Sequence, residues 1–110
     1  ITKYLEGTRN CSTLDGEMIQ LEYFLLEKEG TDGNNTVKTY GIEIVKKVIF
    51  GKAIRTETDQ IDCLTHEKEL AKEIINKLIS HSVTPITMPY IINDMMDETL
   101  VHKKQGVFFN

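Results

Sequence analysis

The chain has 110 residues, of which 40% are hydrophobic and 27% charged, and these proportions exclude a disordered or collagen-like protein. Because a chain of this length supports one hydrophobic core, we predict a single domain over residues 1–110, with flexible ends at 1–15 and 104–110. Thirteen basic and seventeen acidic residues give a formal net charge of −4, which argues against a duplex-DNA binder because phosphates require a basic face.

Neither membrane insertion nor a disulfide framework is indicated. The longest apolar runs, such as Tyr23-Phe24-Leu25-Leu26, have only four or five residues, whereas a membrane-spanning helix needs about 20. The N-terminal residues show no signal-peptide pattern. The two cysteines, Cys11 and Cys63, are far apart and form no Cys-x-x-Cys motif. We therefore expect a cytoplasmic protein with reduced thiols and without a cofactor.

Alternating hydrophobicity predicts three strands. The first covers Met18–Glu29, and the turn-forming residues of Gly30–Thr36 then reverse the chain. The second strand covers Val37–Val48, and the third runs from Lys52 to about Cys63. A further strand over Thr2–Glu6 would make the sheet four-stranded.

Two irregularities interrupt this alternation. Gly41 lies inside the second strand, where glycine is costly unless it allows a bulge or a close backbone approach. In the third strand, Ile61 and Cys63 fall on the opposite phase from the alternation that begins at Ile54. We expect a bulge or a strand end near Asp59–Gln60.

Helical periodicity replaces the alternation after Leu64. Thr65 is the predicted N-cap, because its hydroxyl can accept a bond from a free backbone N–H of the first turn. The charges complement the helix dipole, with acidic residues in the first turn and basic ones near the end: Glu67, Glu69, Lys77 and His81. One apolar stripe faces the core: Leu70, Ala71, Ile74, Ile75, Leu78 and Ile79.

A second helix is predicted after Thr87, because Pro85 ends the first helix and Pro89 is tolerated in a first turn. It buries the apolar residues Met88, Ile91, Ile92, Met95 and Met96. Together these elements predict an α+β domain, an antiparallel three- to four-stranded β-meander followed by two helices packed on one face.

The candidate catalytic groups are one thiol and two pairs of carboxylates. Cys63 lies just before a predicted helix N-terminus, where the helix dipole favours a thiolate, although a small buried apolar residue is the plainer interpretation. Asp59 with Asp62, and Asp94 with Asp97, can share a proton or a metal, yet such pairs usually belong to solvated faces. We therefore expect no catalytic residue.

Two partial metal-binding patterns are incomplete. His66-Glu67 begins like a zinc-protease signature, but Leu70 occupies the position of the second histidine ligand. Asp32 begins a calcium-loop pattern, but Val37 stands where that loop requires glycine. We expect no metal site.

Basic residues gather around one predicted hairpin with an aromatic residue at its tip: Lys46, Lys47, Phe50, Lys52 and Arg55. An exposed aromatic ring among basic side chains can stack on a base of single-stranded nucleic acid. Lysines at strand edges also prevent strands from pairing between molecules, and the overall charge is negative. The structural role is the favoured interpretation.

A candidate partner-binding stripe lies on the second predicted helix: Tyr90, Asp94, Asp97 and Val101. These residues recur at spacings of four, three and four, so they share a face opposite Ile92. An aromatic anchor beside carboxylates is typical of a modest protein interface. The alternative is that Tyr90 packs beside a proline and that the carboxylates are simply solvated.

The sequence also resembles a known family. The strand Thr39–Lys47, with its Tyr-Gly-Ile-Glu-Ile run, precedes the helix Ala71–Leu78, the Thr-Pro turn of Val83–Ile86 and the acidic last helix at Ile91–Asp94. Over Met18–Met96 this order is similar to a domain-of-unknown-function family of short cytosolic proteins from Firmicutes. The resemblance implies a bacterial cytosolic source and supplies no activity, ligand or site.

The sequence therefore favours a non-catalytic protein-interaction or regulatory module. Its partner is an unidentified protein or a second copy of the chain. The alternatives are a small enzyme that uses Cys63 or a carboxylate pair, and a single-stranded nucleic-acid binder that uses the Lys46–Arg55 hairpin.

Overall fold

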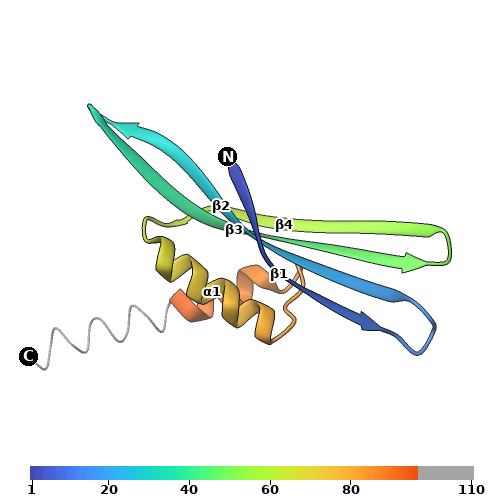
Figure 1. Cartoon of the computed structure of the whole chain (residues 1–110). Helices are drawn as coiled ribbons and strands as arrows, with labels where there is room; N and C mark the ends of the chain where they lie inside the picture. Colours follow the sequence, from blue (N-terminus) through green and yellow to red (C-terminus); the bar gives the residue numbers. More distant parts are fainter. Residues whose placement is uncertain (97–110) are drawn as a thin grey trace, which may run out of the picture.

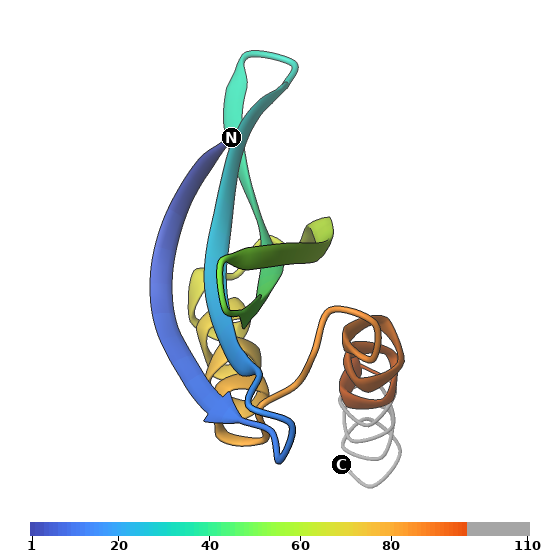
Figure 2. The same cartoon turned by 90° about the vertical axis from the view of Figure 1, so that its right-hand side faces the viewer.

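The computed structural model describes residues 1–96 and places four antiparallel strands in the order β1-β2-β3-β4, followed by two helices (Figure 1). The elements are β1 (Thr2–Ser12), β2 (Met18–Asp32), β3 (Asn35–Phe50), β4 (Ala53–Thr65) and α1 (Lys68–Ser80), and a second helix occupies residues 88–96. Figure 2 shows both helices on the concave side of the curved sheet. The predicted α+β architecture is confirmed.

The strands are longer than the alternation predicts. The chain reverses within Gly30–Thr36 as predicted, but Asp32 pairs with Asn35, so only two residues make the turn. Gly33 takes a positive φ of 64° at the first turn position, as a type II′ hairpin turn requires. Gly51 does the same at the β3–β4 turn, with a φ of 60°. Each glycine closes a short turn, and the polar residues around Gly33 continue the ladder.

Strand β1 spans residues 2–12, within the segment 1–15 for which a flexible end was predicted. It pairs with β2 along its length, and its register shifts between Leu5 and Gly7. A Cβ at Gly7 would lie 2.7 Å from Ile79 Cδ1, so glycine allows α1 to pack closely over this edge strand. The strand is therefore anchored both by the sheet and by the helix.

Gly41 permits the close backbone approach that its position in β3 predicts. A Cβ on Gly41 would overlap the carbonyl oxygens of Ile61 and Asp62 in β4. The β3–β4 register shifts at this point, because Tyr40 pairs with Thr65 whereas Ile42 pairs with Ile61. The irregularity predicted at Asp59–Gln60 is therefore misplaced by a few residues. Gln60 itself pairs regularly with Glu43.

The core lies between α1, the second helix and the concave face of the sheet. Tyr23 pairs with Ile44 and Leu25 with Ile42, and all four side chains are buried. The helices and their connection contribute Ala71, Ile74, Ile75, Leu78, Val83, Met88 and Ile92. The Tyr23 hydroxyl donates a hydrogen bond of 2.9 Å to the Val83 carbonyl oxygen. The predicted helical stripe is confirmed, and Tyr23 ties the connection between the helices to the sheet.

The start of α1 differs from the prediction. Thr65 is the last residue of β4, and its hydroxyl accepts a 3.0 Å bond from the Glu67 backbone N–H. Glu67 takes the N-cap position without a side-chain cap, and Glu69 is the acidic residue of the first turn. Since Thr65 still pairs with Tyr40, the sheet keeps this residue extended and the helix begins two residues later than a Thr65 cap would require.

The convex face of the sheet also buries two side chains. Leu26 is 2% exposed and Glu43 is 6% exposed, although neither faces the helices. Lys3 Nζ lies 2.7 Å from Glu43 Oε1 and 5.8 Å from the centre of the Phe24 ring. The lysine both neutralises the buried carboxylate and covers the ring. This cluster joins β1, β2 and β3 on the face that alternation predicts to be solvated.

Candidate functional site

The β1–β2 and β3–β4 turns lie at the same end of the sheet, which we call the hairpin end (Figure 1). The helices cover the middle of the concave face, and the strands project past them at this end (Figure 1). Four of the nine exposed large hydrophobic residues of residues 1–96 gather here: Leu14, Met18, Phe50 and Ile54. We call these four residues the hairpin-end surface.

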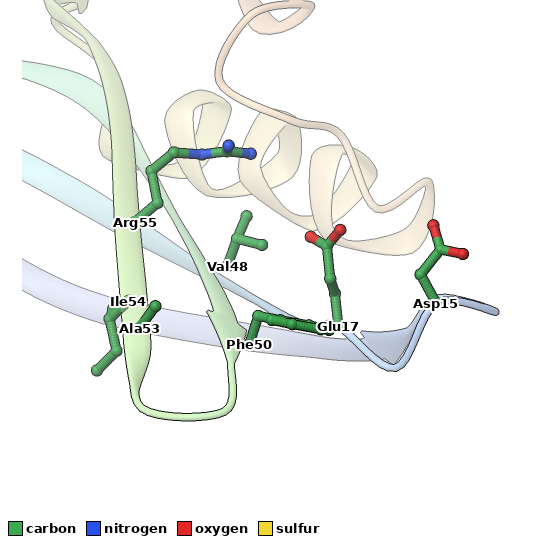
Figure 3. A pocket seen from close by; sticks show the side chains of 7 residues that line it. All are labelled: Asp15, Glu17, Val48, Phe50, Ala53, Ile54 and Arg55. Carbon is green, nitrogen blue, oxygen red and sulfur yellow. The ribbon is translucent and has the colours of Figure 1, made fainter.

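A pocket of about 400 Å³ opens at the hairpin end, between the two turns. Val48, Phe50 and Arg55 project into it from β3 and β4, and Asp15 and Glu17 stand on the opposite wall (Figure 3). The lining is mainly apolar. Ile54 points to the other side of the sheet (Figure 3), where its register neighbour is Ile49 and the next is Met18. Apolar side chains therefore surround the sheet edge on both faces.

Hydrogen bonds within the β1–β2 turn fix the backbone that carries Asp15 and Glu17, which we call the acidic wall of the pocket. Thr13 N–H donates to the Glu17 carbonyl oxygen at 2.9 Å, and Glu17 N–H donates to the Thr13 hydroxyl at 3.2 Å. Gly16 N–H donates to the Thr13 carbonyl oxygen at 3.1 Å, with a φ of 87° that glycine adopts without strain. The backbone is thus fixed at Glu17, while the carboxylates of Asp15 and Glu17 stay available.

The charge of the pocket is negative. Arg55 Nε lies 3.5 Å from Oε1 of Glu57, a carboxylate that also lies 3.9 Å from Lys46 Nζ, so the lining itself holds two carboxylates against one cation. Within residues 1–96, Asp15 and Glu17 form no ion pair. The negative charges of Asp15 and Glu17 are therefore not neutralised by a cation of residues 1–96, and they lie beside the apolar side chains of Val48 and Phe50. Such a site favours a ligand that combines apolar side chains with positive charge.

The part of β2 and β3 that extends past the helices to the turn at Gly33 is called the β2–β3 arm (Figure 1). A second pocket, of about 350 Å³, lies beside this arm and includes Cys63 and His66. Cys63 is exposed, and its Sγ lies 3.7 Å from the Thr39 hydroxyl. His66 Nδ1 lies 3.2 Å from the Lys38 carbonyl oxygen. In the described part of the chain, no hydrogen bond joins His66 to Cys63, so the geometry does not pair a nucleophile with a base. The interpretation of Cys63 as a buried apolar residue is wrong, because Cys63 is exposed.

Within residues 1–96, the paired carboxylates that the sequence singled out do not line the pocket that contains Cys63. Gln60 connects Asp59 and Asp62, donating its N–H to Asp59 Oδ1 at 2.8 Å and its side-chain amide to Asp62 Oδ1 at 2.7 Å. Asp94 is exposed on the second helix, and Asp97 lies outside the described residues. Among residues 1–96, no three His, Cys, Asp or Glu side chains are placed to hold a metal ion.

The predicted basic cluster is divided between the two faces of the sheet. Lys46 shares the concave face with Glu57, whose Oε2 is 3.9 Å from its Nζ. Lys47 lies on the convex face, with its Nζ 3.1 Å from Glu22 Oε1. Phe50 and Lys52 are exposed at the turn, and Arg55 is paired as described above. Nucleic-acid binding by these residues stays a prediction, for which the structure brings together only Phe50 and Arg55 in one pocket.

The stripe on the second helix lies apart from the hairpin-end surface. Tyr90 is 72% exposed and Asp94 is exposed, while Ile92 is buried on the opposite side of the helix. Asp97 and Val101 lie outside the described residues. Partner binding by Tyr90 and Asp94 stays a prediction.

Glu27, in β2 near the β2–β3 turn, is stabilised in its ionised form by its neighbours. Tyr4 donates a hydrogen bond of 3.0 Å to Glu27 Oε2, and Lys38 Nζ lies 3.4 Å from Glu27 Oε1. The hydrogen bond from Tyr4 and the charge of Lys38 lower the pKa of Glu27 below its usual value. The same contacts raise the pKa of Tyr4 and the pKa of Lys38. This cluster holds β1 and β3 to β2 beyond the helices.

Comparison with protein families matches residues 2–98 to a family of unknown function, DUF6514. The chain belongs to this family. The match includes the whole sheet and α1, so the resemblance to a domain-of-unknown-function family is confirmed. No curated protein and no solved structure matches the chain. None of the helices in residues 1–96 of this DUF6514 chain has the length and apolarity needed to cross a membrane.

Sequence reasoning missed one wall of the pocket in this DUF6514 domain. It singled out Phe50 and Arg55, but not Asp15 and Glu17. The available signal was topological, because alternate turns of an antiparallel meander lie at the same end of the sheet. The predicted strand order therefore already implied that residues 13–17 and 51–52 are neighbours.

Proposed function

We propose that this protein is a non-catalytic interaction module whose hairpin-end surface binds a polypeptide segment with apolar side chains beside basic ones. The observation that carries this proposal is the apolar pocket at the hairpin end, where Val48 and Phe50 lie opposite the carboxylates of Asp15 and Glu17, which are unpaired within residues 1–96. Leu14, Met18 and Ile54 are exposed at the same end of the sheet. Exposed apolar groups are common singly, but several at one end of a sheet, beside unpaired charges, are typical of an interaction site.

The chemistry of the pocket favours a polypeptide over the other classes of ligand. Asp15 and Glu17 would repel the phosphates of a nucleic acid. A small-molecule site usually encloses its ligand and directs several polar groups at it, whereas this pocket lies open between two turns (Figure 3). A peptide can place one or two apolar side chains in the pocket and pair its basic side chains with the rim.

The absence of catalysis is part of the proposal. Its support is that the candidate groups are dispersed. Cys63 lies near the end of β4, whereas the hairpin end is at the start of β4, and Asp94 lies on the second helix. The further role we propose is regulatory, in the cytoplasm of a Firmicutes bacterium. The two free, exposed cysteines support a reducing compartment.

The test is selection from a random peptide library displayed on phage, with the full chain immobilised. We expect the enriched peptides to carry a pair of large apolar residues within a few positions of Lys or Arg. Binding should be lost in Phe50→Ser and in Glu17→Lys. The matched control is Tyr90→Ser, which also removes an exposed aromatic side chain but lies on the second helix.

Two outcomes would contradict the proposal. One is the absence of any enriched consensus. The other is a consensus whose binding survives Phe50→Ser and Glu17→Lys but is lost in Tyr90→Ser, which would place the interaction on the second helix.

A further inference from the structure

We propose that the segment bound by the hairpin end is Lys103–Phe109 of a second copy of this chain. This inference rests on the proposed function, because it names the occupant of the same pocket. Self-association then proceeds by insertion of one copy's C-terminal segment between the β1–β2 and β3–β4 turns of another copy.

The composition of this segment matches the pocket. Residues 99–110 contain two of the 13 basic residues, Lys103 and Lys104, and none of the 17 acidic ones. They also contain Val107, Phe108 and Phe109. All 17 acidic residues therefore lie in residues 1–98, and residues 99–110 carry positive charge without negative charge.

The pocket combines negative charge with apolar side chains, which complements the basic and apolar residues of the segment. Asp15 and Glu17 form its uncompensated wall, and Val48 and Phe50 provide apolar contact area. Phe108 lies four positions after Lys104 in the sequence, a span of about 14 Å in an extended chain. That length allows the lysines to reach the acidic wall while the phenylalanines enter the pocket, so charge and apolar contacts are made together.

The direction of the helices indicates a second copy. Helix α1 runs toward the hairpin end, since Lys72 lies near Glu6 and Arg9 Nε donates to the Ile79 carbonyl oxygen at 2.9 Å. The second helix runs back the other way (Figure 1). Over residues 88–96 an α-helix advances about 12 Å, here away from the pocket.

The path that the chain would have to take after this helix points the same way. From residue 96 to Lys103 the chain spans at most about 25 Å when fully extended. To reach its own pocket, the segment would have to reverse and first recover the distance travelled by the helix. A second copy can present its pocket directly to the segment, so exchange between copies satisfies the geometry without reversal.

The experiment measures self-association of the full chain by sedimentation equilibrium at low ionic strength, with charge-reversal variants. We expect Asp15→Lys/Glu17→Lys and Lys103→Glu/Lys104→Glu each to weaken association at least tenfold. An equimolar mixture of these two variants should associate as strongly as the unaltered chain, because one variant's segment then matches the other's pocket. Phe108→Ser/Phe109→Ser should also weaken association at least tenfold.

The matched control is Asp32→Lys/Glu73→Lys, which makes the same change in net charge at two exposed positions outside the pocket. It should associate within about twofold of the unaltered chain, because its altered charges lie outside the proposed contact. Circular dichroism of each variant confirms that the fold is retained before association is compared.

Three results would overturn the inference. They are a chain that stays monomeric to millimolar concentration, association that none of the variants weakens, and a mixture that fails to restore it. If the chain is monomeric while the peptide selection still yields an apolar–basic consensus dependent on Phe50, only the second-copy occupant is wrong. If the selection gives no such consensus, the proposed function itself fails.

Discussion

Strand β3 crosses two regions with opposite properties. Ile42 and Ile44 are fully buried beneath the helices, whereas Phe50, six residues further along the same strand, is 58% exposed. The residues are similarly hydrophobic, so their composition does not explain the difference. The helices cover the middle of the sheet and leave the hairpin end uncovered (Figure 1). On the concave face of the sheet, burial is therefore set by helix coverage.

This contrast separates folding from binding. The covered centre holds the core, including Tyr23, Ile75 and Leu78. At the hairpin end, Leu14, Met18, Phe50 and Ile54 remain exposed and belong to no core cluster of the described residues. Apolar side chains that contribute little to folding are available to a partner. Changes in the two regions should therefore have different consequences.

The largest effect is expected in the covered centre. Ile75→Ala removes a fully buried side chain from α1, and such a truncation costs about 2–5 kcal/mol of unfolding free energy. Ile86→Ala is the control, because this isoleucine is exposed and its truncation should change stability by less than about 0.5 kcal/mol. Urea denaturation of both variants measures the difference. Equal effects would contradict the assignment of the core.

The next largest effect concerns the close approach of β3 and β4. Gly41→Ala forces a Cβ against the carbonyl oxygens of Ile61 and Asp62, and we expect a loss of about 1–3 kcal/mol. Gly30→Ala is the matched control in β2, where the nearest atom lies 4.0 Å from the new Cβ. A Gly41→Ala variant as stable as the control would show that β4 does not cross β3 so closely.

Much of the covered centre could be predicted from the sequence. The alternation at Tyr40, Ile42 and Ile44 and the helical stripe of α1 identified the two faces that form the core, because burial on one side imposes those periods. Gly41 was also understood correctly, since glycine inside a strand requires a reason. In these places, burial of one side of a strand or helix produces both the sequence pattern and the packing in the structure.

The rest depends on information that local pattern does not contain. Five of the seven residues of Gly30–Thr36 are Gly, Asp or Asn, which favour turns, so the sequence alone did not show that Gly33 and its neighbour suffice. Thr65 is a good helix cap, but its pairing with Tyr40 keeps it in the sheet. The acidic wall at Asp15 and Glu17 becomes part of a pocket only when β3 and β4 place Phe50 and Arg55 beside it.

A smaller effect is expected for Tyr23→Phe, which removes the hydrogen bond to Val83 and should cost about 1 kcal/mol near neutral pH. Burial raises the pKa of Tyr23 from 10.0 to about 12. The folded state therefore favours the protonated hydroxyl, and this stabilisation is complete below pH 10 and is lost as the pH rises to about 12.

Unfolding measured between pH 8 and pH 12 checks this expectation. Tyr23→Phe should lose stability less steeply than the unaltered chain above pH 10, whereas Tyr90→Phe, on the exposed surface, should follow the unaltered chain. Parallel curves for Tyr23→Phe and the unaltered chain would contradict the buried, ionisation-sensitive hydroxyl.

At acidic pH, a modest effect is expected at the β2–β3 arm. The pKa of Glu27 is lowered by the Tyr4 hydrogen bond and the Lys38 charge, so its ionised form stabilises the fold. That stabilisation is present above the unfolded-state pKa of about 4.3 and is lost as the pH falls through the lower folded-state value. Glu27→Gln should flatten the acid limb of the stability curve. Glu29→Gln, whose Oε1 is 3.8 Å from Lys38 Nζ, is the control and should flatten it less.

The most direct measurement of the division between folding and binding is the unfolding free energy of Phe50→Ser/Ile54→Ser. Because association of copies would add stability, it is measured by urea denaturation at the lowest workable protein concentration. Both side chains are exposed, at 58% and 66%, so we expect a change of no more than about 0.5 kcal/mol for each. A loss of several kcal/mol, comparable to that of Ile75→Ala, would show that these side chains belong to the core and would contradict their assignment to a binding surface.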